Sequence, residues 1–170
     1  MTPTKTKRKQ LQSAVDGKRL IASNKKARHD YDFLEVIECG IALRGSEVKS
    51  LREARVQLRD SYARIDGGEV WLFGVHISPY EMAGAYGALD PMRVRKLLLH
   101  RTQIDKLRNQ LQLQKLTLVP VSMYFRSGRV KVELALAKGR HTYDKRRELA
   151  KRDAELEVRR VAKNLGVRIS

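Results

Sequence analysis

The sequence predicts a mainly β domain with accessory helices, followed by a flexible basic C-terminal tail. The chain has 170 residues, which is the length of one domain with short extensions. Runs of alternating apolar and polar residues lie on either side of turn signals such as Asp66-Gly67-Gly68 and Ser127-Gly128, as in antiparallel hairpins. Residues 139–170 have no such alternation and are rich in charged helix formers.

Five strands are expected along the body of the chain. Gly40 lies inside the first and indicates a bend or bulge. Pro120 lies inside the fourth, and because proline donates no backbone hydrogen bond, it predicts an edge or bulge position. The five predicted strands are Tyr31–Leu43, Ser61–Ile65, Val70–Ile77, Leu116–Phe125 and Arg129–Ala137.

Two helices are predicted within the body. The first begins with Ser46 as its N-cap and ends near Ala54. The second follows Thr102-x-x-Asp105, a pattern that resembles a capping box, and has leucines and isoleucine at helical spacing. Residues 78–92 contain two glycines and two prolines and are expected to form a loop.

The C-terminal segment Tyr143–Asn164 contains strong helix formers, and Asp144 can cap a helix there. Its apolar residues are sparse, so the isolated helix would be marginal in water. We expect a flexible tail that becomes helical on RNA. The alternative is a helix docked permanently on the body.

The charge indicates the class of partner. Lys and Arg number 36 against 19 Asp and Glu, a net charge of +17, and residues 1–28 and 139–170 carry most of the excess. Nucleic acid is the first partner to consider and an anionic membrane the second. We expect a basic disordered N-terminal extension over residues 1–23, an RNA-binding body over 24–138 and a basic tail over 139–170.

Several classes of protein are disfavoured. The chain has no apolar run as long as a membrane span and no signal-peptide core, so we expect a cytoplasmic protein with no membrane partner. The single cysteine, Cys39, is expected to be a buried packing group and excludes a disulfide framework or Cys-cluster zinc site. No Walker loop, dinucleotide fingerprint or hydrolase motif is present, so we expect neither an enzyme nor a cofactor or metal site. His76 is expected to be structural.

Two basic patterns are candidate phosphate contacts. Lys49, Arg52, Arg55 and Arg59 would form a stripe if the first helix extended that far, although a solvated face is an equal alternative. Arg93-x-Arg95-Lys96 precedes three leucines that are either an RNA contact or core. Aromatic residues are only 6% of the chain, which disfavours a broad base-stacking platform and favours recognition of RNA backbone and shape.

Eight blocks in order resemble the SmpB family of bacterial SsrA-binding proteins over about residues 24–160. They are Asn24-Lys25-Lys26-Ala27-Arg28-His29-Asp30-Tyr31, Gly45-Ser46-Glu47-Val48-Lys49-Ser50-Leu51-Arg52, Asp60-Ser61-Tyr62, His76-Ile77-Ser78-Pro79-Tyr80, Arg95-Lys96-Leu97-Leu98-Leu99, Leu116-Thr117-Leu118-Val119-Pro120, Lys131-Val132, and Ala137-Lys138-Gly139 with Tyr143-Asp144-Lys145-Arg146.

The resemblance implies an oligonucleotide-binding (OB)-type β-barrel with helices packed around it, and a tail that becomes helical on the ribosome. It implies an RNA-binding adaptor that binds the tRNA-like domain of transfer-messenger RNA (tmRNA) and delivers it to stalled ribosomes for trans-translation. The tail would replace the anticodon stem in the decoding centre and mRNA channel of the small subunit. Elongation factor Tu (EF-Tu) and alanyl-tRNA synthetase would be indirect partners through tmRNA, and the protein would be a monomer without cofactors.

The resemblance also implies roles for individual residues. Glu38, Leu98 and Lys131 match positions that the family uses against tmRNA, and Asn24 is a further tmRNA candidate. Their chemistry fits, because a carboxylate accepts from base amino groups, leucine packs on sugar or base, and lysine meets phosphate. The structural alternatives are a core Leu98 and an ion-paired Glu38. The decoding-centre candidates are His29, Gly139, Asp144, Lys145 and Arg146.

The chain departs from the family pattern at two places. Lys115 stands where the family usually has glycine, and Arg140-His141 replaces the common Lys-Lys. The runner-up to the adaptor is a general basic RNA-binding or ribosome-associated protein of the same fold. An RNA-processing enzyme is the third alternative.

Overall fold

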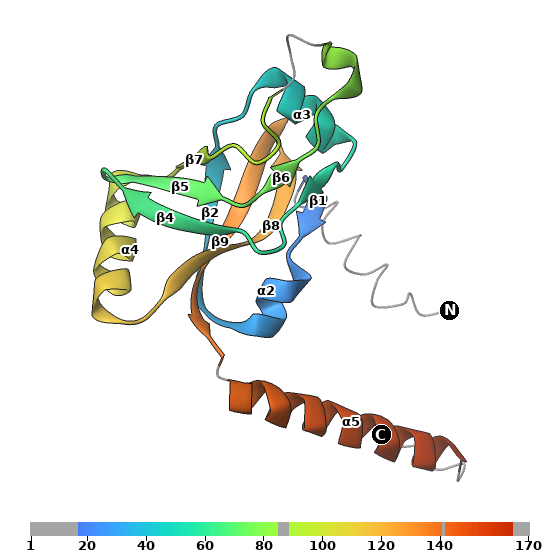
Figure 1. The fold of residues 1–170 in the computed structure, drawn as a ribbon. Helices are drawn as coiled ribbons and strands as arrows, with labels where there is room; N and C mark the ends of the chain where they lie inside the picture. Colours follow the sequence, from blue (N-terminus) through green and yellow to red (C-terminus); the bar gives the residue numbers. More distant parts are fainter. Residues whose placement is uncertain (1–16, 85–88, 141, 165–170) are drawn as a thin grey trace. The chain divides into compact units, whose positions relative to one another are not determined.

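The computed structural model describes residues 17–84, 89–140 and 142–164 (Figure 1). It divides into two units, Met1–Lys138 and Gly139–Ser170. The first unit contains the sheet and the short helices, and the second contains one long helix. Each unit is described by itself below.

The first unit is built on a seven-stranded sheet that closes on itself. The strand order is β1-β8-β4-β5-β7-β2-β9, and β8 also pairs with β9. Six strands therefore form a closed circuit, as an OB-type barrel requires, and β1 adds to β8 from outside it. The strands are β1 (Lys18–Ser23), β2 (Tyr31–Ile41), β4 (Tyr62–Asp66), β5 (Glu69–Phe73), β7 (Arg95–Leu98), β8 (Thr117–Arg126) and β9 (Arg129–Gly139), with β3 (Val56–Gln57) and β6 (His76–Ile77) in a small separate sheet.

The core lies inside the closed sheet because apolar residues alternate along its strands. Ile37, Cys39 and Ile41 of β2 are buried together with Val132 and Leu134 of β9, as the two-residue period of a strand demands. Helix α4 (Arg101–Leu113) adds Ile104 and Leu107 to this cluster, and helix α3 (Gly45–Arg52) adds Leu51. The predicted burial of Cys39 is confirmed.

A second, smaller cluster anchors the short helix α2 (Lys25–Asp30), which the sequence did not predict. Ala27 of this helix packs against β8 and β9, where the apolar residues are small. The methyl-sized groups allow the helix backbone to approach the sheet closely. The buried members of the cluster are Ala27, Val119, Val121, Ala135 and Ala137.

The predicted strands are present, with one division. Val70–Ile77 is split into β5 and β6 because Gly74, between them, has a φ of +74° that a strand cannot contain. The hairpin at Ser127-Gly128 is confirmed. The β8–β9 register shifts between Pro120 and Ser122, which confirms the bulge predicted at Pro120.

The predicted helix caps are wrong by a few residues. Helix α3 begins after Arg44, whose backbone N–H donates to Glu47 Oε2 at 2.9 Å, so Ser46 lies inside the helix. Helix α4 begins after His100, whose N–H donates to Gln103 Oε1 at 3.1 Å, so Thr102 is also internal. In both cases the residue at the third helical position supplies the cap that a hydroxyl was expected to supply.

The predicted disorder of residues 1–23 is wrong for residues 18–23, which form β1. This strand pairs with β8 from Lys18↔Arg126 to Ser23↔Ser122. Ile21 and Ala22 pack against the core, and Lys18 lies over the ring of Tyr124 at 4.9 Å. Charged side chains on an exposed strand explain why its composition resembles that of a disordered segment. Residues 1–16 lie outside the described part.

The second unit contains helix α5 (Thr142–Asn164). The helical state expected on the ribosome is thus the state that the structure describes, and the flexibility of the tail stays a prediction. Asp144 is the third residue of the helix and therefore does not stand at the N-cap position, before the first helical residue. Between residues 149 and 163, where side chains are described, Leu149, Leu156, Val158 and Val161 are all exposed.

Candidate nucleic-acid interface

Glu38 lies on the outer face of β2, next to Leu98 of β7. Its neighbours Ile37 and Cys39 are buried inside the sheet, so the Glu38 side chain points outward. Gly40, two residues along on the same face, pairs with Leu98, and a Cβ atom at Gly40 would come within 3.2 Å of Leu98 Cβ. Glycine at this position therefore allows Leu98 to lie across β2, beside Glu38.

Lys131 lies on the other neighbouring strand. Val130 and Val132 of β9 are buried, so Lys131 points outward like Glu38. The thiol of Cys39 donates to the carbonyl oxygen of Val132 at 3.3 Å, which places β9 directly beside β2. The structure therefore brings Glu38, Leu98 and Lys131, which come from three consecutive strands, together on one outer face.

The carboxylate of Glu38 is held in place by two residues of β8. The Tyr124 hydroxyl donates a hydrogen bond to Oε2, and Arg126 Nη1 donates to the same oxygen at 3.0 Å. The Tyr124 bond is the largest cause that lowers the pKa of Glu38, with smaller contributions from Arg126 and Lys18. Burial and the bond to Glu38 raise the pKa of Tyr124. Glu38 is therefore an ionised, positioned acceptor that forms an ion pair with Arg126, and its contact with tmRNA stays a prediction.

Glu38 remains accessible despite these partners. Its side chain is 31% exposed, so part of it is in contact with solvent. Leu98 is 51% exposed, so the core alternative for it is wrong. Leu34 and Val36 of β2 are exposed as well, and they share the strand parity of Glu38. An apolar strip thus borders the charged residues, and such a strip suits the sugar and base faces of a nucleic acid.

Asn24 has a structural role instead of the predicted RNA contact. It is the N-cap of α2, and its Oδ1 accepts from the Ala27 N–H at 3.0 Å. Its Nδ2 donates to the carbonyl oxygens of Leu58 at 2.9 Å and Pro120 at 3.1 Å. With both donors used and only 4% of the residue exposed, the side chain is not available to RNA.

His29 lies in the last turn of the helix that Asn24 caps. Its imidazole is exposed, and Nδ1 lies 3.0 Å from Asp30 Oδ1. The flat ring and the neighbouring Arg28 are presented to solvent, as base stacking requires. Asn24 therefore supports the predicted decoding-centre residue by fixing its helix to β8.

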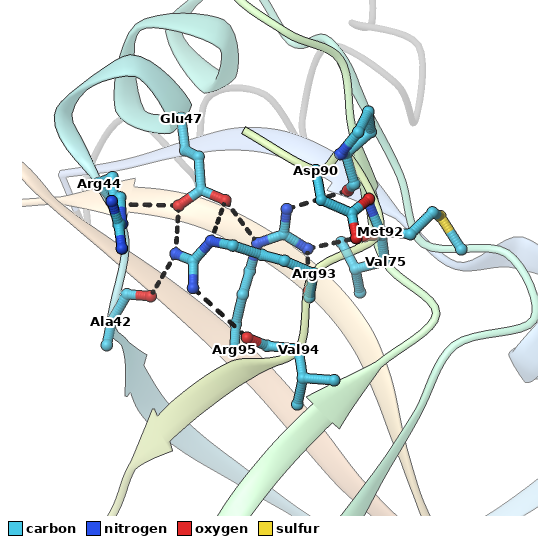
Figure 2. Close-up of polar contacts among 10 residues, drawn as sticks. Ala42, Arg44, Glu47, Val75, Asp90, Met92, Arg93, Val94 and Arg95 are labelled. Carbon is cyan, nitrogen blue, oxygen red and sulfur yellow. Dashed lines mark hydrogen bonds and ion pairs between the residues drawn. The ribbon is translucent and has the colours of Figure 1, made fainter. Parts of the chain in front are cut away.

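The predicted phosphate contact at Arg93-x-Arg95-Lys96 is wrong for both arginines, as Figure 2 shows, and Lys96 forms an ion pair with Glu69. Arg95 is 1% exposed, and its Nε donates to Glu47 Oε1 at 2.8 Å, while Arg93 Nη2 donates to Glu47 Oε2 at 2.5 Å. Arg95 Nη1 also donates to the Val75 carbonyl oxygen at 2.8 Å. Burial acts to raise the pKa of Glu47, but hydrogen bonds from Arg93, the Arg44 backbone and Arg95 outweigh it and lower the pKa overall.

The predicted basic stripe on the first helix is wrong as well. Helix α3 ends at Arg52, so Arg55 and Arg59 are not on it. Arg55 donates to Glu81 at 2.8 Å, and Lys49 lies over the ring of Tyr80 at 5.3 Å. Arg55 and Lys49 therefore hold the loop after β6, and the four cations do not form one stripe along the helix.

The tail candidates lie in the second unit. Gly139 is the exposed last residue of β9. Asp144, Lys145 and Arg146 lie within α5, and their side chains are outside the described part. Within the described residues, no cluster of His, Cys, Asp and Glu could hold a metal ion. None of the described helices is long and apolar enough to cross a bilayer.

Tyr124 and Arg126 are the site residues that sequence reasoning missed. Both lie in the predicted fourth strand and its hairpin, where alternation places Tyr124 on the face opposite Met123 and Phe125. The signal that could have identified them is a tyrosine and an arginine two residues apart on the outer face of one strand. Their partner Glu38 is 86 residues away from Tyr124, so only the fold shows that they meet.

The comparisons with known proteins point to one family. The family model described as "SmpB protein" matches residues 21–164. The chain is 52% identical over 152 residues to an SsrA-binding protein of Acetivibrio thermocellus, covering 89% of this chain and 98% of that protein. It is 55% identical to one of Mycobacterium ulcerans, covering 84% of each. A solved structure described as "tmRNA-SmpB: a journey to the center of the bacterial ribosome" matches with a TM-score of 0.60 and 48% identity, covering 75% of this chain and 89% of that one.

Proposed function

The chain belongs to the SmpB family, and from this we propose that it is an RNA-binding adaptor for ribosome rescue. It binds the tRNA-like domain of tmRNA and delivers that RNA to stalled bacterial ribosomes for trans-translation. It acts by binding and not by catalysis, and it acts in the cytoplasm.

The outer face formed by Glu38, Leu98 and Lys131 carries this proposal. It combines a positioned acceptor, an exposed apolar surface and a cation within three adjacent strands. An ionised carboxylate can accept hydrogen bonds from base amino groups but cannot donate a hydrogen bond. Leucine suits a sugar or an unstacked base, and lysine suits phosphate. This set favours an exposed, folded region of RNA over a continuous duplex.

The tail supplies the contact with the ribosome in this proposal. Residues 139–170 hold ten Lys and Arg against five Asp and Glu. In α5, Arg152, Arg159 and Lys163 recur at helical spacing with exposed side chains. A basic helix of this kind is suited to a phosphate-walled channel such as an empty mRNA path, with Gly139, Asp144, Lys145 and Arg146 entering through the decoding centre. In the first unit, His29 is the candidate for contact with the decoding centre.

Sequencing the RNA that copurifies with the protein tests the function. We expect one dominant species with a tRNA-like end. Ribosomal RNA alone would support a general ribosome-associated protein, and turnover of RNA by the pure protein would support an enzyme. Either of these two results would contradict the adaptor.

A gel shift with the isolated tRNA-like domain tests the site. Lys131→Ala should weaken binding by about tenfold, because it removes one phosphate contact within the interface. Lys138→Ala, which removes the same charge from an exposed position on the same strand, is the matched control and should change affinity by less than about twofold. Equal losses in both variants would mean that the affinity is set by net charge alone.

A further inference from the structure

A groove on the first unit lies between β4, the end of α4 and the start of β8. Strand β4 pairs with β8 only at Ala63↔Leu118, and the groove occupies the space beyond that pair. It is open to solvent and has a volume of about 530 Å³, within the usual range for small-ligand sites. Its walls are residues 63–67, residues 116–118 and three residues of α4, namely Arg108, Leu111 and Gln112.

The chemistry of the groove combines an apolar floor with two cations. Ile65, Leu111 and Leu116 are partly buried and line it. Arg64 and Arg108 are also among its lining residues, and neither has a hydrogen-bond or ion-pair partner within the part of the chain that the structure describes. Arg64 alternates with the buried Ala63 and the partly buried Ile65, so its side chain lies on the outer face of β4, at the rim of the groove. Arg93 and Arg95, in contrast, both donate to Glu47. No contact within the described residues uses the guanidinium groups of Arg64 and Arg108, so both are available to an anionic ligand.

We propose that this groove binds one unpaired nucleotide of a single-stranded RNA segment. The base packs on the floor of Ile65, Leu111 and Leu116, and Arg64 and Arg108 hold the flanking phosphates. A flat, uncharged base fits an apolar floor, and guanidinium groups bind phosphate in a bidentate way and also stack on bases. The choice of RNA as partner rests on the proposed function.

The groove is separate from the interface around Glu38. In the closed circuit β8-β4-β5-β7-β2-β9, β4 and β2 are three steps apart in either direction, so they lie on opposite sides of the barrel. Strand β8 contributes to both sites, but the groove lies at its start, whereas Tyr124 and Arg126 lie at its end. A nucleotide in the groove therefore does not compete with RNA bound to Glu38, Leu98 and Lys131. The two sites can be occupied in the same molecule at the same time.

The test uses the full-length protein and a labelled adenosine hexanucleotide RNA, with binding followed by fluorescence anisotropy. Arg64→Gln with Arg108→Gln should weaken binding by at least about fivefold, since two phosphate contacts are lost. Arg44→Gln with Arg59→Gln, which removes two exposed arginines outside both sites, is the matched control and should change affinity by less than about twofold. Thermal unfolding of all variants checks that each is folded. Equal weakening in the two double variants would overturn the proposal.

Methyl NMR of the wild-type protein identifies the bound group. The RNA should shift the methyl signals of Ile65, Leu111 and Leu116. Equal shifts with inorganic phosphate alone, or with a hexaglutamate peptide, would overturn the nucleotide assignment in favour of a simple anion or an acidic protein segment. Absence of shifts with the RNA would overturn it as well.

The outcome is distinguishable from failure of the proposed function. Lys131→Ala and the tRNA-like domain report on the Glu38 interface, and the hexanucleotide with Arg64 and Arg108 reports on the groove. If Lys131→Ala weakens binding of the tRNA-like domain but the double variant of Arg64 and Arg108 binds the hexanucleotide as the wild type does, the groove proposal is refuted and the adaptor role is left intact.

Discussion

At the scale of single residues, the two carboxylates that matter most have opposite environments. Glu47 is enclosed by two guanidinium groups, and one of these, in Arg95, is almost fully buried. Glu38 has a tyrosine and an arginine on one side and solvent on the other. The first therefore maintains the fold, and the second is available to a ligand.

Tyr124→Phe should raise the pKa of Glu38. The Tyr124 hydrogen bond is the largest cause that lowers this pKa, and the variant removes that bond while leaving Arg126 in place. An NMR titration of the Glu38 carboxyl group measures the change. Ser122→Ala is the control, because it removes the hydroxyl that donates to Glu133 Oε2 at 2.6 Å in the same strand pair. A Glu38 pKa that is equal in Tyr124→Phe and wild type would contradict the assigned cause.

The pH dependence of stability follows from the same group. Because the folded-state pKa of Glu38 is lowered, its ionised form stabilises the fold above the ordinary value of 4.5, and this contribution is lost as the pH falls through the folded-state pKa. We expect the difference in unfolding free energy between wild type and Glu38→Gln to shrink below about pH 4.5. Urea unfolding at several pH values measures it. A difference that stays constant down to pH 2 would contradict this prediction.

Glu47→Ala should destabilise the protein by about 3–5 kcal/mol, because it leaves the buried Arg95 charge without its acid partner. Arg93→Ala should cost less, since its side chain is 26% exposed and can be solvated. Urea denaturation gives both values. The double variant Glu47→Leu with Arg95→Met should recover much of the loss, because no unpaired charge remains in the interior. Similar losses of stability for Glu47→Ala and Arg93→Ala would show that the unpaired Arg95 charge is not the cause of the larger loss.

At the scale of elements, the sequence predicts the turns and bulges that neighbouring residues determine. The Ser127-Gly128 hairpin and the bulge at Pro120 follow from the turn residues and from a missing donor, and both are present. Strand β1, in contrast, depends on pairing with β8, about 100 residues later along the chain, and its own composition resembles a solvated segment. The Arg93-x-Arg95 motif is misleading for the same reason, because its partner Glu47 lies in another element.

Helix α5 should exchange its amide hydrogens much faster than the sheet. Its described apolar side chains are exposed, so packing adds little to a helix that is marginal by itself. Hydrogen exchange should label residues 149–163 within seconds to minutes and residues 118–124 of β8 over hours. Comparable protection of both segments in the free protein would show that the tail helix is stabilised by packing, as the docked alternative requires.

At the scale of the whole molecule, binding and rescue should be separable. Removal of residues 139–170 should leave affinity for the tRNA-like domain nearly unchanged, because Glu38, Leu98 and Lys131 lie in the first unit. The same deletion should abolish peptide tagging on stalled ribosomes, since the tail makes the proposed decoding-centre contact. A gel shift and a tagging assay measure the two effects. A truncated protein with lost tmRNA affinity would contradict the separation.

The salt dependence of tmRNA binding should be smaller than the net charge of +17 suggests. Many cations are already paired within the fold, including Arg93, Arg95 and Arg126. We expect about four to seven phosphate contacts, each contributing a slope of about −0.7 to −0.9 in log affinity against log salt. Titrations at several salt concentrations give the slope. An affinity independent of salt would refute a binding mode dominated by phosphate contacts.

The closed circuit of strands also constrains the order in which the chain acquires its structure. Strand β9 completes the ring because it pairs with both β2 and β8, and among the described strands it is the last to be synthesised. Until it emerges, β2 lacks one neighbour and the inner face of the sheet is open. Contacts such as Cys39 with Val132, 93 residues apart, make ring closure a slow, non-local step. The newly made chain therefore passes through a period in which apolar strands are exposed. This period ends only when residues 129–139 have paired.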